Sequence, residues 1–526
     1  MFYRASLQAA AAFASLSLLA GCGLLSDSGS KGEQKIVVGT TSEPSTLDPA
    51  AAWDNSWELM RNVFQTLVSF PTGSTKPEPD AAEWCRFTDD ASTSYRCKMR
   101  KGLKFSNGDK LDAAAVKYSI DRISEIAFKN GPVGMLGSLD RVETKGDDIV
   151  VFHLTRPDAT FPFILATPAM SLVAPSDYSQ HKIRNDGKVT GSGPYLLDSY
   201  KPGTRAELVK NPDYQGFAHR KNDAVTIRYF KESAPVVAAL RKKEIDAIYR
   251  GLTAEEVVGL ERDQSKDGQP RIVETVGADI RFLVFNPEDP AAGNVAVRRA
   301  IAQLVDRDAL VAKVYQGTAE PLYSMVPKGI AGHTTSFFDA YGDPDRAKAK
   351  QILSKAGINK PVELTFWYAT DRYGSSTAPE FDELKRQLDG SGLFRITLRS
   401  TTWTPFQEGF TKGEYPVFGR GWFPDFPDAD NFIAPFVGKQ SVTGMPYLKD
   451  EITKQLLPET RRKSDRGAVA KQFERAQRIL VEDVRLLPLW QGKLYVASGE
   501  DIGGGERALD PQTVMQMWEF YRKTSW

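Results

Sequence analysis

Histidine and cysteine are scarce in this 526-residue chain, which holds four histidines and three cysteines. The histidines are isolated, and none has a partner at a spacing typical of a metal site or a catalytic triad. The chain also lacks Gly-x-Ser-x-Gly, His-Glu-x-x-His, phosphate-loop and dinucleotide-binding motifs. The histidines are His153, His181, His219 and His333. The sequence therefore gives no support for catalysis, a bound metal or a cofactor.

An excess of charge of either sign is also missing. The chain has 68 basic and 67 acidic residues, a formal net charge of +1. This balance does not favour nucleic acid or a strongly charged macromolecule as a partner. Apolar residues make up 41% of the chain and there are nine tryptophans. We expect a globular protein whose clefts are lined by aromatic side chains.

Long apolar runs are absent beyond the N-terminus. The run at residues 9–20 follows Arg4 and is too short to be a stable membrane span. It ends in Leu-Ala-Gly-Cys22, which resembles the cleavage motif of a bacterial lipoprotein signal. The alternative is a signal peptide that is cleaved near a chance cysteine. The resemblance predicts a signal peptide over residues 1–22 and lipidation of Cys22. A flexible tether over residues 23–32 would then hold the protein to the extracytoplasmic face of the membrane.

The other two cysteines, Cys85 and Cys97, lie in segments that read as two strands of a hairpin. If Phe87 pairs with Tyr95, the same register places Cys85 directly opposite Cys97 on one face of the hairpin. Facing positions lie at a separation that a disulfide can bridge. A zinc site would need more ligands than two cysteines. The sequence therefore predicts a structural disulfide.

Strand-like and helix-like segments alternate along the chain. Alternating or β-branched runs predict strands, and apolar residues at helical spacing predict helices. Among others, strands are expected at residues 35–40, 149–154, 225–230 and 245–249, and helices at residues 57–67, 113–123 and 235–240. This alternation favours an α/β fold over an all-helical one.

The segment at residues 419–432 combines aromatic, proline and acidic residues. Trp422 and Phe423 precede Asp425, with further acids at Asp428 and Asp430. A stiff aromatic surface with a carboxylate at its edge can hold a cation or an amine. An acidic turn packed by aromatic residues would have the same composition. Both interpretations stay open on this segment alone.

Several phrases in order resemble those of the bacterial extracellular solute-binding proteins of family 5, the peptide- and nickel-type receptors of ABC importers. The phrases are Glu-Pro-Ser-Thr-Leu-Asp-Pro at 43–49, Met-Arg-Lys-Gly-Leu-Lys-Phe-Ser-Asn-Gly at 99–108, Gly-Ser-Gly-Pro-Tyr at 191–195, Asn-Pro-Asp-Tyr at 211–214 and Ala-Leu-Arg-Lys-Lys-Glu-Ile-Asp at 239–246. Each phrase is weak by itself, but their order and spacing are specific. The resemblance covers essentially all of the chain after the tether.

The resemblance implies a two-lobed, periplasmic-binding-protein-like α/β fold of type II, cluster C, with a subdomain inserted in lobe I. The implied order is lobe I at 33–70, the insert at 71–188, lobe I at 189–283, lobe II at 284–493 and lobe I at 494–526. Ligand binding would close the lobes by rigid-body rotation. The closed form would meet a membrane permease that is driven by an ATPase, and the receptor itself would be a monomer.

The resemblance also implies a site for a short peptide. An extended ligand would pair with residues 421–425 as an added strand, and Asp425 would meet its α-ammonium. Main-chain contacts would come from Ser42, Glu43 and Pro44. The expected aromatic pocket walls are Trp403, Trp422, Phe423 and Tyr373.

Two departures from the family pattern limit this assignment. Pro424 and Pro44 each remove a backbone donor at the expected site. No basic residue adjoins either position, although Arg372, Arg399 and Arg420 are near in sequence. An oligosaccharide or another small solute therefore remains an alternative ligand, and sensing an alternative to import. A secreted hydrolase is disfavoured because no catalytic group appears.

Overall fold

The computed structural model describes residues 34–53 and 55–523. The predicted signal peptide, the tether and the lipidated Cys22 lie outside the described residues and stay predictions. No helix in the described part of the chain combines the length and the apolar character that a membrane span requires.

Eleven strands of the described chain form one large mixed sheet. One half of it is built around β1, which pairs in parallel with β10 and with β11. The strands of this half, in spatial order, are β8 (Tyr195–Lys201), β9 (Arg205–Lys210), β10 (Ala224–Tyr229), β1 (Lys35–Thr40) and β11 (Ala247–Tyr249). The helices near this half are α1 (Ser56–Val63), α4 (Ser233–Arg241) and α5 (Ala254–Asp263).

The other half of the sheet contains the parallel pair β14 and β15 and the strand β16 beside them. Its strands are β15 (Phe394–Thr401), β14 (Val362–Ala369) and β16 (Val417–Trp422), with β13 (Ala319–Pro321) off the main path. The helices of this half are α6 (Val295–Leu304), α7 (Arg307–Leu310), α8 (Ser336–Tyr341), α9 (Arg346–Lys355), α10 (Thr377–Gly390), α11 (Trp403–Thr411), α12 (Asp430–Ile433), α13 (Leu457–Thr460) and α14 (Ala470–Asp483).

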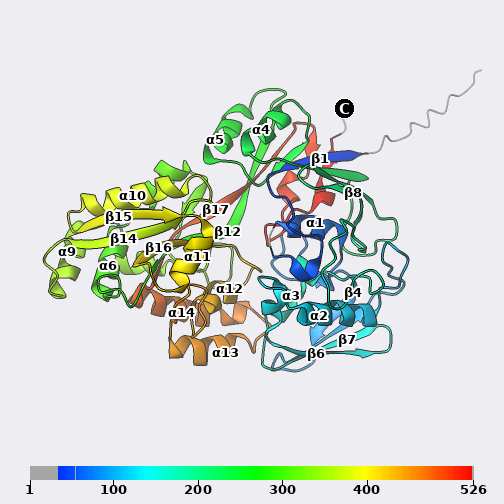
Figure 1. The fold of residues 1–526 in the computed structure, drawn as a ribbon, viewed down its shortest axis with the longest axis horizontal. Coiled ribbons are helices and arrows are strands. Elements are labelled where there is room, and N and C mark those ends of the chain that lie inside the picture. The colour runs from blue at the N-terminus through cyan, green and yellow to red at the C-terminus, as the bar shows by residue number, and fades with distance from the viewer. Residues whose placement is uncertain (1–33, 54, 524–526) are drawn as a thin grey trace, which may run out of the picture. The chain divides into compact units, whose positions relative to one another are not determined.

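Two long strands, β12 (Arg271–Phe285) and β17 (Leu486–Ser498), join the halves of the sheet (Figure 1). They pair antiparallel with each other in both halves. The register shifts between Val276 and Ile280, so the ladder is interrupted at the crossing. The main chains approach closely there, because a β-carbon at Gly277 would overlap the main-chain oxygen of Gly492. We call this interruption of the ladder, where β12 and β17 pass from one half of the sheet to the other, the crossing of the two strands.

Side-chain alternation along β12 divides the second half into two cores. Leu283 and Phe285 pack into the core under α6 and α10, whereas Phe282 and Val284 pack into the core that contains α11 and α14. All four side chains are buried. A central strand covered on both faces is apolar throughout, which explains the continuous apolar run that ends in Phe285.

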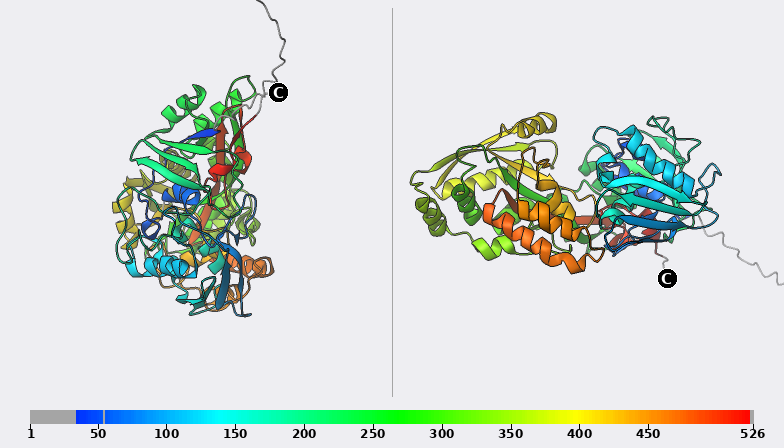
Figure 2. Two further views of the ribbon diagram at one scale, coloured as in Figure 1. Left: turned by 90° about the vertical axis from the view of Figure 1, so that its right-hand side faces the viewer. Right: turned by 90° about the horizontal axis from the view of Figure 1, so that it is seen from below.

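A second sheet of four strands lies between β1 and β8 in the chain. Its spatial order is β4 (Ala82–Phe87), β5 (Ser94–Met99), β7 (Ile149–Leu154) and β6 (Leu139–Lys145). Helix α2 (Ala113–Ile126) packs along β6 and β7 (Figure 2). Asp112 caps α2, since its carboxylate accepts from the Ala115 amide at 3.0 Å. The chain also contains α3 (Phe161–Leu165) and the short pairs β2 (Val68–Ser69) with β3 (Glu78–Pro79) and β18 (Ile502–Gly503) with β19 (Tyr521–Arg522).

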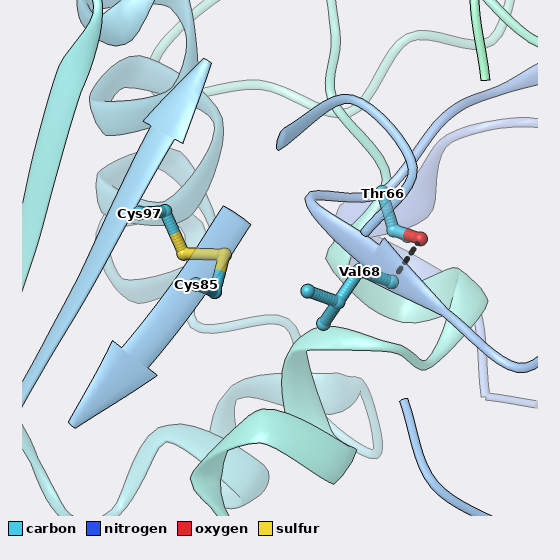
Figure 3. Close-up of a disulfide and its surroundings, with 4 residues drawn as sticks. All are labelled: Thr66, Val68, Cys85 and Cys97. Carbon is cyan, nitrogen blue, oxygen red and sulfur yellow. Dashed lines mark hydrogen bonds between the residues drawn. A yellow bond between two sulfur atoms is a disulfide. The ribbon is translucent and has the colours of Figure 1, made fainter. Parts of the chain in front are cut away.

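The predicted hairpin and its disulfide are confirmed. Phe87 pairs with Tyr95, and Cys85 pairs with Cys97 and is bonded to it (Figure 3). The Phe87 and Tyr95 rings meet edge to face, with centroids 4.9 Å apart. Cys97 is fully buried. The disulfide therefore fastens the first two strands of the second sheet.

The first helix is shorter than predicted. The apolar spacing predicts a helix over residues 57–67, but α1 ends at Val63 and Phe64 is extended. The Val63 carbonyl accepts from Gly193 at 3.1 Å, and the Gln65 carbonyl accepts from Leu172 at 2.9 Å. These long-range hydrogen bonds replace the last helical turn. The helical spacing of the apolar residues did not predict this end of the helix, because Phe64 is buried although its main chain is extended.

We expect removal of the disulfide to destabilise the protein without unfolding it. The two cysteines are 12 residues apart, and opening a loop of this length costs about 3 kcal/mol in the unfolding free energy. Denaturant unfolding of Cys85→Ala/Cys97→Ala beside the oxidised wild type measures this difference. Equal unfolding midpoints would contradict a stabilising role.

The crossing of β12 and β17 should not tolerate a side chain at Gly277. The substitution Gly277→Ala would push a methyl group against the Gly492 carbonyl and should lower the unfolding free energy by about 1–3 kcal/mol. Gly259 in α5 is a matched control, because a β-carbon there meets no atom. Gly259→Ala should be neutral or stabilise by about 1 kcal/mol. Equal effects of the two substitutions in thermal melts would refute the close approach.

Candidate ligand-binding site

A cavity of about 430 Å³ lies between groups from the two halves of the sheet. Its first wall comes from the start of α1, from the end of β11 and from the C-terminal segment. Its second wall comes from residues 420–425 and from the starts of the segments that follow β14 and β15. The first wall contains Trp53, Asn55, Trp57, Glu58, Arg250, Gln512, Thr513 and Val514, and the second contains Arg372, Tyr373, Trp403 and residues 420–425.

Asn431 on α12 holds the Asp425 segment in place. Its Oδ1 accepts from the Asp425 main-chain amide at 3.0 Å and from Trp422 Nε1 at 3.1 Å. Its Nδ2 donates to Asp425 Oδ2 at 3.0 Å. One buried amide side chain thus orients the carboxylate, its own main chain and the neighbouring indole.

The Asp425 carboxylate has no cationic partner among the described residues. It lies partly buried in the cavity wall, and burial raises its pKa from 3.8 to about 6 although the Asn431 hydrogen bond opposes this shift. A carboxylate that loses hydration without gaining a positive charge is destabilised in its ionised form. A cation that enters the cavity would relieve this cost.

The other two acids of the segment are used internally. Asp428 accepts two hydrogen bonds from Arg466, at 2.7 and 2.9 Å, and Asp430 accepts two from Arg461, both at 2.9 Å. Both aspartates are buried, and such forked pairs are geometrically specific. The segment therefore combines the two interpretations of its sequence, with a structural acidic turn beside one carboxylate that faces the cavity.

Strand β16 has an open edge at the cavity. Its ladder with β12 extends to Trp422, but its ladder with β14 stops at Phe418. The main chain after Phe418 therefore has no strand on the β14 side. Gly421 is required here, because a β-carbon would overlap the Arg281 guanidinium and touch the Tyr373 ring. An extended ligand can pair with such an edge.

All four aromatic residues that were predicted as pocket walls line the cavity. Tyr373 and Trp403 meet edge to face with ring centroids 5.9 Å apart, and Trp422 packs in the same way on Phe436. Phe423 is 44% exposed. Trp53 on the opposite wall is 39% exposed, and no sequence motif selects it. Large apolar side chains that remain exposed in a cavity are typical of a ligand site.

The first wall contains an ion pair between Arg250 and Glu58, and the backbone of Arg250 has an unusual conformation. Arg250 Nε lies 2.7 Å from Glu58 Oε1, and Arg250 Nη2 donates to the Thr513 hydroxyl at 2.9 Å and to its carbonyl at 3.1 Å. Arg250 and Thr513 have φ angles of 61° and 66°, in the left-handed region. Strained non-glycine residues concentrate at functional sites. Burial raises the pKa of Glu58 to about 7, although Arg250 opposes the shift.

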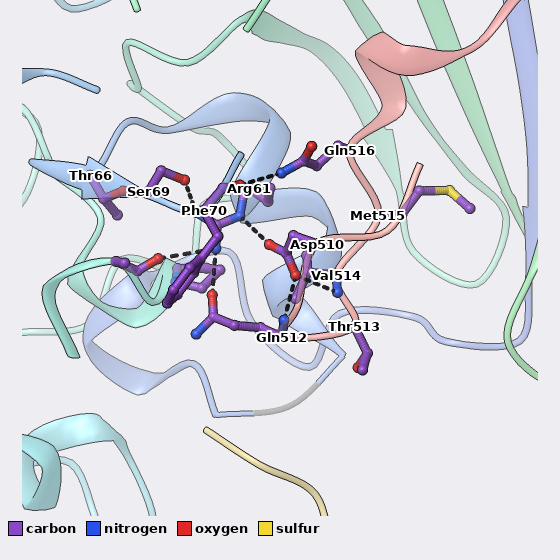
Figure 4. A network of polar contacts seen from close by, with 12 residues as sticks. Arg61, Thr66, Ser69, Phe70, Asp510, Gln512, Thr513, Val514, Met515 and Gln516 are labelled. Atoms are coloured by element: carbon purple, nitrogen blue, oxygen red, sulfur yellow. Dashed lines mark hydrogen bonds and ion pairs between the residues drawn. The ribbon is translucent and has the colours of Figure 1, made fainter. Parts of the chain in front are cut away.

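A buried arginine connects α1 to the C-terminal segment (Figure 4), and Gln512 of that segment contacts the Asp425 segment. Arg61 on α1 donates to Asp510 at 3.1 Å and to the Gln512 side chain at 2.6 Å. Gln512 in turn donates to the Asp425 carbonyl at 2.6 Å. The same guanidinium also donates to Ser69 at 2.6 Å. The N-terminal helix, the C-terminal segment and the second wall are thereby linked by hydrogen bonds.

Three predicted contact residues are not brought to the cavity. Ser42, Glu43 and Pro44 are absent from its lining. Glu43 instead accepts from the Tyr200 hydroxyl at 3.0 Å and from the Gly203 amide. Their role in ligand contact stays a prediction. Of the three arginines that were considered as anion partners, Arg372 and Arg420 line the cavity and Arg399 does not.

Sequence reasoning missed most of the first wall. Glu58, Arg250, Gln512 and Thr513 lie far apart in the chain, and no motif joins them. The only local signal was Arg250 followed by Gly251, a pair that follows a strand and suggests a sharp turn. Within the described residues, no group of three or more histidine, cysteine or acidic side chains could hold a metal ion.

The fold and the cavity define a class, the two-lobed binding proteins that hold a ligand between lobes. The model described as bacterial extracellular solute-binding proteins, family 5 Middle, matches residues 76–444. The chain belongs to this family, and the predicted two-lobed α/β fold and family membership are confirmed. The boundaries predicted between the lobes and the inserted subdomain stay predictions.

Curated relatives match along most of their length. The chain is 25% identical over 492 residues to the probable D,D-dipeptide-binding periplasmic protein DdpA of Escherichia coli (strain K12), with 89% of this chain and 90% of the relative covered. It is 24% identical over 481 residues to di/tripeptide-binding protein 1 of Pseudomonas aeruginosa (strain UCBPP-PA14), with 86% and 88% covered.

The fold is also similar to that of solved structures. The dipeptide-binding protein from Pseudoalteromonas sp. SM9913, solved in complex with Met-Leu, superposes with a TM-score of 0.76 at 19% identity. The match covers 93% of this chain and all of that one. At this identity the likeness supports the fold.

Replacing the Asp425 carboxylate should stabilise the ligand-free protein. Its pKa is raised to about 6, so the ionised form is disfavoured in the folded state, and this cost is present above pH 6 and absent below the unfolded pKa of 3.8. Asp425→Asn should therefore raise the unfolding free energy by about 1–3 kcal/mol at pH 7. The gain should vanish near pH 3.5. Denaturant unfolding at the two pH values measures it, and a gain that does not depend on pH would contradict this origin.

Proposed function

We propose that this protein is the extracytoplasmic receptor of an ABC importer and that it binds a short peptide in the cavity and delivers it to the permease. The observation that carries the proposal is the Asp425 carboxylate, which faces the cavity without a cationic partner among the described residues. The α-ammonium of a peptide supplies the missing charge. Asn431 holds the carboxylate ready, so little ordering is needed when the ligand binds.

The open edge of β16 supports an extended ligand. The main chain at Gly421 and Trp422 lies in the cavity wall beyond the last β14 pair, where it can bond to peptide groups of the ligand. Pro424 has no amide hydrogen, so strand-like pairing ends before Asp425 and the carboxylate takes over the contact. Main-chain bonds of this kind are independent of the ligand's side chains.

The dimensions of the cavity favour a short ligand. Its volume of about 430 Å³ lies in the lower part of the range of about 300–1,000 Å³ typical of small-ligand sites. Arg372 and Arg420 on the second wall can receive the terminal carboxylate. The names of the relatives, which refer to dipeptides and tripeptides, support the same ligand class.

Strands β12 and β17 supply the hinge that movement of the lobes during transport requires. A hinge at the interrupted ladder of β12 and β17 would let the lobes close as rigid bodies and present a closed form to the permease. We propose that the protein works as a monomer that is anchored at the extracytoplasmic face through lipidated Cys22. Its task is binding, without catalysis. The same closed form could serve a sensor, and only genes for a permease and an ATPase beside this one would distinguish the two roles.

Peptide binding should depend on the Asp425 carboxylate and on a free amino group. Isothermal titration at pH 7 should detect Ala-Ala binding to the wild type, with a loss of about 30-fold or more for Asp425→Asn and for N-acetyl-Ala-Ala. Affinity should fall below pH 6, where Asp425 takes up a proton, and above about pH 8, where the α-ammonium loses one.

Asp267→Asn is the matched control, since Asp267 is exposed and does not line the cavity. This variant should bind as the wild type does. Equal binding of the acetylated and free peptides would refute the ammonium site. Recovery of a sugar or another small solute by native mass spectrometry, with no peptide bound, would replace the peptide assignment by the alternative ligand class.

A further inference from the structure

The charged groups of the cavity wall do not balance one another. Two acids, Glu58 and Asp425, face three arginines, Arg250, Arg372 and Arg420. Uncompensated charge that is partly buried is costly, and a ligand of the opposite charge removes that cost. The ligands that the cavity favours therefore depend on which of these charges are already paired within the protein.

The first wall is neutral when Glu58 is ionised. Arg250 and Glu58 form an ion pair at 2.7 Å, and Thr513 takes two further hydrogen bonds of the guanidinium. The pair is internal to lobe I and needs no ligand group. Burial raises the pKa of Glu58 to about 7. Where this acid is protonated, the charge of Arg250 remains and the first wall is positive.

Arg420 is the first of two unpaired cations on the second wall. Its guanidinium lies 4.7 Å from the centroid of the Phe410 ring, and no carboxylate contacts it among the described residues. Its Nε and Nη1 are buried and have no hydrogen-bond partner. Buried guanidinium donors are nearly always satisfied, so these two atoms leave hydrogen-bonding capacity that the described residues do not fill. Burial lowers the pKa of Arg420; the Tyr373 side chain opposes this shift, and the charge of Arg372 adds to it.

Arg372 is the second unpaired cation. It stacks on Trp403, with its guanidinium carbon 5.1 Å from the ring centroid, and it makes no ion pair within the part of the chain that the structure describes. Because Arg372 and Arg420 rest on different rings, Trp403 and Phe410, they present two positions for anionic groups. The two ring centroids are 6.3 Å apart.

We propose that the cavity selects acidic peptides, which carry one ammonium group for Asp425 and two carboxylates for Arg372 and Arg420. This selectivity rests on the peptide-binding function proposed above. A peptide of net charge −1 leaves no charge of the second wall uncompensated, whereas a neutral zwitterion leaves one guanidinium without a partner. A peptide with a basic side chain adds repulsion.

Pairs of dipeptides that differ only in one charge test the selectivity. Ala-Glu is compared with Ala-Gln, and Asp-Ala with Asn-Ala, so that the acid is offered at either position. Isothermal titration at pH 7 should give at least about tenfold tighter binding for the acidic member of one pair, since a hydrogen bond to a charged group is stronger than one to a neutral group. Ala-Lys should bind more weakly than Ala-Gln.

Variants assign the preference to the two arginines. Arg420→Gln and Arg372→Gln should each bring the ratio of acidic to neutral affinity toward one, and Arg420→Lys, which keeps the charge, should retain part of it. Arg372 is exposed, so its variant reports even if Arg420→Gln folds poorly. Arg399→Gln is the matched control, because Arg399 is exposed on β15 and does not line the cavity.

The outcomes separate the two proposals. Equal affinities within both pairs would overturn the acidic preference and leave the peptide receptor in place. A preference that survives both Gln variants would overturn the assignment to these arginines. Failure of all the dipeptides to bind would refute the peptide function, and the acidic preference would fall with it.

Discussion

The pairing of β12 with β17 is the interaction on which the rest of the structure depends. Each strand contributes its first part to one half of the sheet and its last part to the other half, so both halves share a single antiparallel pair. The ladder shifts register around Gly277, where the two main chains come too close for a side chain, and again between Arg281 and Phe282. The walls of the cavity extend from the two halves, and their separation is therefore set at this crossing. A receptor built in this way can change the angle between its lobes without repacking either core.

The Asp425 segment is held by hydrogen bonds and ion pairs with its neighbours. Asp428 and Asp430 hold Arg466 and Arg461, and Asn431 ties Trp422 to the main chain of Asp425. These contacts leave one carboxylate of the segment directed at the cavity. Pre-organised groups lose less freedom when a ligand binds, so the energy of the new charge pair is retained in the affinity.

Local patterns predicted local features well. The alternation of strand side chains was sufficient to place Cys85 opposite Cys97. The aromatic and acidic segment was also recognised, because its composition is concentrated in one stretch. The partners of Arg250 were not predictable, since Glu58 and Thr513 are distant in the chain and meet only after folding. Long-range contacts can also hold a segment in an extended conformation although its apolar residues have helical spacing, as at Phe64. The sequence does not predict such contacts.

The order of the strands has a consequence for how the chain acquires its fold. β17 lies between β11 and β12 in space, yet its residues 486–498 come almost at the end of the chain. Neither half of the sheet is complete until these residues are present, because β11 and β12 both pair with β17. Such long-range pairing makes folding slow and late. Loss of the last forty or so residues would leave both lobes without their common strand.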